Sequence, residues 1–140
     1  MSTVLWANLW IDGIVECESE DRAALYAHAK ALDALTRKLG LPSFLALCDT
    51  TDVRYNLDEF DLPEGMTSTD QVMARDGAWL PLSDALAMLE GLLARVVERE
   101  VRFGWWRNAH GEVVAELRAV IAFARAAEGR AQKFNFGIVT

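Results

Sequence analysis

The chain of 140 residues has the length of a single globular domain, and its composition, 52% apolar and 25% charged, argues against a disordered protein. Its net charge of −7 at pH 7 repels phosphate groups, which argues against nucleic acids and anionic membranes as partners. Two cysteines without a CxxC spacing make no disulfide framework and are typical of reduced thiols in a cytoplasmic protein.

The N-terminal segment predicts a β-strand over residues 3–11. Its alternate residues form a wholly apolar face, made of Leu5, Ala7, Leu9 and Ile11. Asp12 and Gly13 either form a hairpin turn to a return strand over residues 14–17 or simply end the first strand. Because Asn8 interrupts the apolar run and no stretch approaches about 20 apolar residues, we expect neither a signal peptide nor a membrane span.

Residues 19–39 predict the first helix, with Ser19 as its N-cap and with Gly40 and Pro42 at its end. Its buried stripe is expected at Leu25, His28, Leu32, Leu35 and Leu39. The short apolar segment 43–48 fits a buried strand or one turn of helix equally well, because periodicity does not separate the two.

Residues 49–81 lack a sustained apolar period and are predicted to be irregular, apart from a short helix near residues 67–74 with Thr67 or Ser68 as its cap. Residues 49–76 hold eight acidic and two basic residues, a net charge of −6. Nearly all of the negative charge of the chain therefore lies in one middle segment.

The clearest pattern predicts a helix over residues 83–102. Its apolar stripe consists of Leu82, Ala85, Leu86, Leu89, Leu92, Leu93, Val96 and Val97. A helix over residues 112–128 follows a short connection and is expected to lie antiparallel to it. The stripe of this helix consists of Val113, Leu117, Val120, Ile121 and Ala124. Residues 132–139 alternate and predict a terminal strand.

This order of elements predicts one α+β domain over residues 1–140, built in two layers. We expect a small sheet that contains the N-terminal and C-terminal strands and packs on one face against about three helices.

The standard catalytic and nucleotide-binding motifs are absent from the sequence, and no pattern indicates a cofactor. Asp49, Asp52 and Asn56 follow an apolar segment and offer oxygen ligands of the kind that Mg²⁺ or Ca²⁺ binds. Their spacing matches no defined metal loop, and Asp, Thr and Asn also cap helices and form turns. A metal site and a purely structural role both stay open.

Cys48 is a candidate nucleophile only if an imidazole activates it, and His28 and His110 are the two imidazoles of the chain. A cysteine at the end of an apolar run is more often a small buried hydrophobic residue. His28, placed on an apolar stripe, is typical of a hydrogen-bonded core histidine.

Two surfaces are candidates for binding a partner. Trp105, Trp106 and Arg107 lie between two predicted helices, and Trp and Arg are enriched where interfaces are strongest. One tryptophan could instead close the end of the helix pair while the other lies on the surface. The acidic segment offers a second surface, represented by Asp58, Glu59 and Asp61, which would attract a basic protein.

The leading hypothesis is a small acidic cytoplasmic protein without catalysis that binds a partner, in the manner of an inhibitor or immunity protein. A metal-dependent enzyme or metal-binding protein that uses Asp49, Asp52 and Asn56 is the alternative. A structural homodimer that buries its tryptophans is a further alternative.

Overall fold

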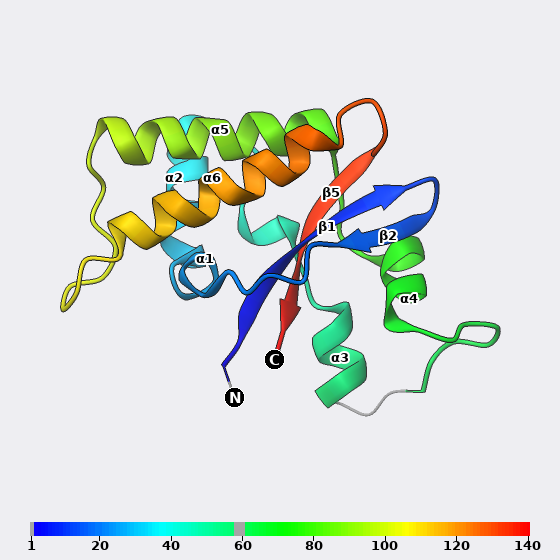
Figure 1. Cartoon of the computed structure of the whole chain (residues 1–140). Helices are drawn as coiled ribbons and strands as arrows, with labels where there is room; N and C mark the ends of the chain where they lie inside the picture. The colour runs from blue at the N-terminus through cyan, green and yellow to red at the C-terminus, as the bar shows by residue number, and fades with distance from the viewer. Residues whose placement is uncertain (1, 58–60) are drawn as a thin grey trace.

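The computed structural model describes residues 2–57 and 61–140 (Figure 1). In chain order its elements are β1 (Val4–Ile11), β2 (Ile14–Cys17), α1 (Ala23–Ala27), α2 (Ala29–Leu39), the 3₁₀ turn η1 (Leu45–Leu47), β3 (Cys48–Asp49), α3 (Thr51–Leu57), α4 (Thr69–Asp76), β4 (Leu80–Pro81), α5 (Leu82–Glu98), α6 (His110–Ala126) and β5 (Lys133–Val139). The predicted α+β fold is confirmed.

The sheet is built on the pairing of its first and last strands. β1 and β5 are antiparallel over seven residue pairs, from Val4 opposite Val139 to Trp10 opposite Lys133. The strand order is β2-β1-β5-β3, and the two-residue strand β4 also pairs with β5. Of the strands in the described ranges, only β3 runs parallel to its neighbour. The sheet therefore contains both terminal strands, as predicted, and the strand order places them at its centre.

The turn between β1 and β2 is a tight hairpin. Asp12 and Gly13 both have positive φ, 50° and 88°, as a two-residue turn of this kind requires. Ile11 lies directly opposite Ile14 in the register. The hairpin interpretation is confirmed over a simple end of the strand.

One face of the sheet is apolar and carries the core. α1 lies against β1, while α5 contacts β5 and packs along α6 (Figure 1). The strand residues of this core are Leu5, Ala7, Leu9, Phe134 and Phe136, all fully buried. The alternation read from the first strand thus selects the face that the long helices cover.

The single helix predicted over residues 19–39 is wrong in its start and in its continuity. Residues 18–22 run along β1 instead: Arg22 N–H donates to Leu5 O over 2.9 Å, and Glu18 N–H donates to Ala7 O over 2.9 Å. Ser19 has a φ of 52° and caps no helix. At His28 the backbone leaves helical geometry, which separates α1 from α2.

The segment 49–81 is less irregular than predicted, since it contains α3, α4 and β4. Ser68 is the N-cap of α4, as expected, and its hydroxyl accepts a hydrogen bond from Gln71 N–H over 3.3 Å. Only Val72 and Met73 of α4 are fully buried. A helix held by two apolar residues leaves too weak a period to recognise in the sequence.

α3 and α4 contact the second face of the sheet, which carries two buried asparagines beside apolar side chains. The side-chain amide of Asn8 donates to Asn135 Oδ1 over 3.0 Å and approaches the Met73 sulfur at 3.6 Å. Asn135 in turn donates to Ala78 O over 2.8 Å, and Trp10 Nε1–H donates to Ala74 O over 3.1 Å. Hydrogen bonds from the strands therefore fix the position of α4 and the chain that follows it.

α5 and α6 form an antiparallel helical hairpin. α5 ends at Glu98, earlier than the predicted residue 102, because Glu100 takes a left-handed φ of 47° and Val101 N–H donates to Val96 O over 3.0 Å. Residues 99–109 form the loop to α6, which we call the tryptophan loop.

No helix within the described ranges is long and apolar enough to cross a membrane.

Asp33 ties α2 to the chain before η1. Its Oδ1 accepts the Ser43 hydroxyl over 2.5 Å and Leu45 N–H over 3.1 Å, and the Ser43 bond lowers the pKa of the carboxyl. We expect Asp33→Asn to reduce the free energy of unfolding at pH 7 by about 1 kcal/mol, the difference between charged and neutral hydrogen bonds.

The lowered pKa of Asp33 adds stability that is present above the pKa of the unfolded chain and is lost as the pH falls through the folded value. Urea unfolding of wild type and Asp33→Asn should therefore differ at pH 7 and converge at acidic pH. Asp84→Asn, on the exposed side of α5, is the control. An equal difference at every pH would contradict this role of the charge.

Candidate functional site

The first of the proposed metal ligands is already engaged by the backbone. Asp49 is buried, and its two carboxylate oxygens accept Thr51 N–H over 2.9 Å and Ala78 N–H over 2.8 Å. Asp52 and Asn56 lie one turn apart on α3, with Asn56 exposed. Among residues 2–57 and 61–140, no three or more His, Cys, Asp or Glu side chains are grouped to hold a metal ion. The metal hypothesis therefore gains no support.

Cys48 is in a poor position to act as a nucleophile. Burial raises the pKa of its thiol to about 12, and the thiol donates to Phe44 O over 3.5 Å. The two imidazoles are engaged elsewhere. His28 packs against Phe103 with ring centroids 5.5 Å apart, and His110 Nδ1 lies 2.7 Å from Val101 O. Cys48 is typical of a partly buried structural thiol.

The fold brings together three groups that the sequence does not associate. The Asp70 residue of α4 is exposed overall, but neighbouring groups partly desolvate its carboxyl, which raises its pKa, and the like charge of Asp52 of α3 raises it further. Burial also raises the pKa of the Cys17 thiol in β2, with smaller contributions from both carboxylates. Asp52 and Asp70 therefore repel each other across α3 and α4. With its raised pKa, the Cys17 thiol stays neutral and does not form a catalytic pair with either carboxylate.

The acidic residues predicted to bind a basic partner are only partly described. Asp58 and Glu59 lie outside the described residues, and Asp61 is exposed. A basic partner for the acidic segment stays a prediction.

The tryptophan loop carries the largest exposed apolar side chains among the described residues. Trp105 and Trp106 are 86% and 84% exposed, so neither closes the end of the helix pair. Their rings meet edge to face, with centroids 5.7 Å apart and planes at 77°. Figure 1 shows the loop projecting from the end of the α5–α6 hairpin, far from the β1–β2 turn. The two tryptophans therefore form one aromatic tip.

Backbone and side-chain hydrogen bonds fix this tip to the core. Phe103 is fully buried, and its N–H donates to Asn108 Oδ1 over 3.1 Å, while its carbonyl accepts Ala109 N–H over 2.8 Å. Asn108 Oδ1 also accepts His110 N–H over 3.1 Å. A closed ring of bonds thus joins the base of the loop to the first turn of α6.

The turn that presents the tryptophans is equally restrained. Arg102 donates from Nε to Gly104 O over 3.0 Å and from Nη2 to Trp105 O over 3.3 Å. Gly104 has a φ of 87°, and a Cβ there would lie 2.7 Å from Arg107 O. Only glycine suits this position, because a side chain would meet both an unfavourable φ and the opposing carbonyl. The tip is therefore held in one shape before any partner binds.

A hollow of about 300 Å³ lies beside the loop. Its lining consists of Ala23, Ala24, Ala27, His28, Arg107, Ala109, Glu112 and Glu116. Its charged groups have partners: Arg107 pairs with Glu112, and the Glu116 carboxylate accepts Ala24 N–H over 3.2 Å. Small side chains with satisfied polar neighbours can receive an apolar side chain of a partner without leaving a buried charge unpaired.

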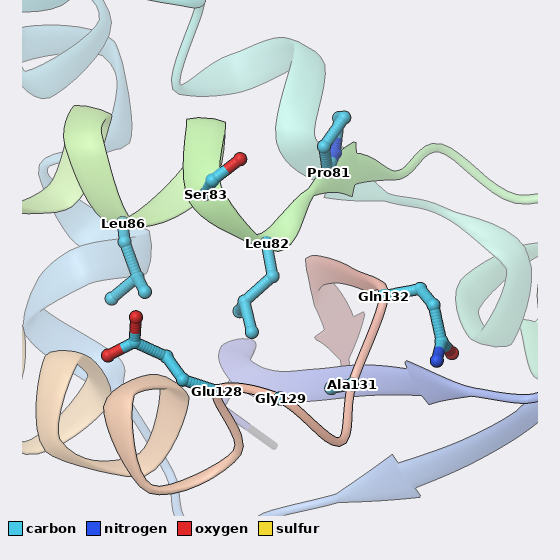
Figure 2. A pocket seen from close by; sticks show the side chains of 8 residues that line it. All are labelled: Pro81, Leu82, Ser83, Leu86, Glu128, Gly129, Ala131 and Gln132. Atoms are coloured by element: carbon cyan, nitrogen blue, oxygen red, sulfur yellow. The ribbon is translucent and has the colours of Figure 1, made fainter.

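A second hollow, of about 270 Å³, lies where β4 and the start of α5 meet the connection from α6 to β5 (Figure 2). Leu82 and Leu86 line one wall, and the Glu128 carboxylate faces Leu86 in Figure 2. Glu128 is the one ionisable group among its lining residues, and it already pairs with Arg125 over 3.0 Å. Its lining includes the Ser83 hydroxyl but neither an imidazole nor a thiol.

The best-formed candidate site is therefore the tryptophan loop with its neighbouring hollow. The sequence singled out Trp105, Trp106 and Arg107 as a group, but it did not show that Arg102, Phe103 and Asn108 fix them. No family model, curated protein or solved structure matches the chain, so the functional argument rests on this geometry.

We expect Asp70→Asn to stabilise the fold at pH 7, because it removes a charge that burial and Asp52 disfavour. The raised pKa of Asp70 means that its favourable contribution is complete below the unfolded pKa and is lost as the pH rises through the folded pKa.

Melting temperatures of wild type and Asp70→Asn should therefore diverge as the pH rises and coincide near pH 3, to be measured by circular dichroism. Glu64→Gln, also exposed and in the acidic segment, is the matched control. A lower melting temperature of Asp70→Asn at pH 7 would contradict the proposed repulsion.

Proposed function

We propose that the chain is a non-catalytic cytoplasmic binding protein whose protein partner docks on the tryptophan loop. One observation carries the proposal: adjacent tryptophans, 86% and 84% exposed, lie on a loop that is hydrogen-bonded at its turn and at its base. Leaving two large apolar side chains in water gains nothing for an isolated domain. Burying them against a partner recovers that free energy, and Trp is among the residues that dominate interface energetics.

The restrained shape of the loop favours binding without a rearrangement of the loop. Side chains and loops that are already ordered lose little conformational entropy when a partner binds. The loop contains three arginines and one glutamate, so its net charge is +2 on a protein whose total is −7. The partner surface that fits this tip is an apolar pocket with acidic residues at its rim.

The tip itself is tested by Trp105→Ser/Trp106→Ser. Proteins captured from a lysate of the source organism are identified and then purified, and their affinity for each variant is measured by calorimetry. We expect the double variant to weaken binding by at least about 2 kcal/mol, the loss typical of a hot spot.

The matched control is Ile14→Ser, which removes a 72% exposed side chain from the hairpin turn at the far end of the molecule. It should leave the affinity unchanged. Equal affinities of the double variant and wild type for every captured protein would refute docking on the loop.

The shape of the loop is tested separately by Gly104→Ala, which keeps both tryptophans. The added Cβ strains a φ of 87° and meets Arg107 O, so the tip must change its conformation. We expect weaker binding together with altered tryptophan fluorescence and an intact helical circular dichroism spectrum. Unchanged affinity would show that the rigidity of the loop is irrelevant to binding.

A further inference from the structure

The outer side of the α5–α6 hairpin keeps part of its apolar stripes at the surface. Leu93 and Ile121 are only half-buried, and Val97 is 42% exposed, although all three continue the stripes that form the core. They line a groove of about 380 Å³ between the two helices. The sheet and the other helices therefore cover only part of the apolar stripes of α5 and α6.

Small side chains flank this groove on both helices. The exposed residues Ala87 and Ala94 lie on α5, and Ala115 and Ala122 lie on α6. Side chains of this size let another helix approach closely, because nothing projects between the backbones.

The charges at the groove are sorted by helix. α5 contributes Glu90 and Glu98, and α6 contributes Arg118. Arg125 of α6 pairs with Glu90, which fixes the levels of the two helices against each other. Along α5, Glu98 lies eight residues after Glu90, and along α6, Arg118 lies seven residues before Arg125. Because the two helices are antiparallel, these steps run in the same direction, so Arg118 lies level with Glu98. Neither Glu98 nor Arg118 forms an ion pair with any residue in the described ranges.

We propose that a second copy of this chain occupies the groove, related by a two-fold axis parallel to α5 and α6. This rotation lays α5 of one copy over α6 of the other without changing the level of any residue. Glu98 then faces the partner's Arg118, and the same contact occurs twice. A two-fold axis across the helices would instead stack α5 on α5 and bring glutamates together. The sorted charges select the first arrangement.

The size of this surface suits a concentration-dependent dimer. Each helix has 17 residues, which corresponds to a length of about 25 Å, and two adjacent helices are about 20 Å wide. Such a face buries on the order of 500 Å² per copy, the lower limit for specific association.

Sedimentation velocity over a concentration series tests the dimer with charge reversals. Glu98→Arg alone and Arg118→Glu alone each create two like-charge contacts per dimer, and each should raise the dimer dissociation constant by at least about tenfold. An equimolar mixture of the two variants forms a heterodimer with both contacts of opposite charge, so it should recover wild-type affinity. The double variant Glu98→Arg/Arg118→Glu should recover it as well.

Recovery in the mixture supports this arrangement, because reduced folding of either variant would not be repaired by mixing. A wild-type chain that stays monomeric at millimolar concentration would overturn the proposal. Failure of the mixture to recover would also overturn it. The double variant Trp105→Ser/Trp106→Ser should still form the dimer. If this variant is monomeric, self-association depends on the tryptophan loop instead of the groove.

Discussion

The pairing of β1 with β5 is the constraint on which the other parts of the fold depend. It joins the two ends of the chain over seven residue pairs, and the core helices and the pair α3–α4 contact opposite faces of the resulting sheet. Its register sorts those faces, since a slip by one residue turns every side chain of a strand over. Such a slip would bring Asn8 into the apolar core and move Leu9 to the face that α4 covers, so the register is strongly specified.

Hydrogen bonds hold the elements on the second face of the sheet, whereas apolar packing holds those on the core face. Buried amides of Asn8 and Asn135 hold α4 and the chain after it by directional bonds, and Asp49 anchors the same chain from β3. Buried polar groups with partners specify position more than they add stability. The arrangement also brings Asp52 near Asp70, whose like charges oppose the packing that the amides enforce.

The proposals rest on two surfaces of the described structure, the tryptophan loop and the outer side of the α5–α6 hairpin. A two-fold axis parallel to these helices leaves the loops of both copies at the same end of the proposed dimer. Two identical tips on one side would engage a repeated or two-fold partner with an effective concentration far above that of a single loop. The two proposals are independent, but together they describe a bivalent binding protein.

The sequence determined those helices and strands that have a clear apolar pattern of their own. The apolar period from residue 82 defined α5, and the alternation up to residue 11 defined β1, because each depends on neighbours along the chain. Asp12-Gly13 allowed a hairpin or a simple strand end, and the pairing of β1 with β2 decided for the hairpin. The tertiary structure alone decided where α1 begins, since residues 18–22 bond to β1. It also decided that Val97 stays at the surface and that both tryptophans face solvent. Exposure depends on what packs above a residue, and the elements that do so are distant in the sequence.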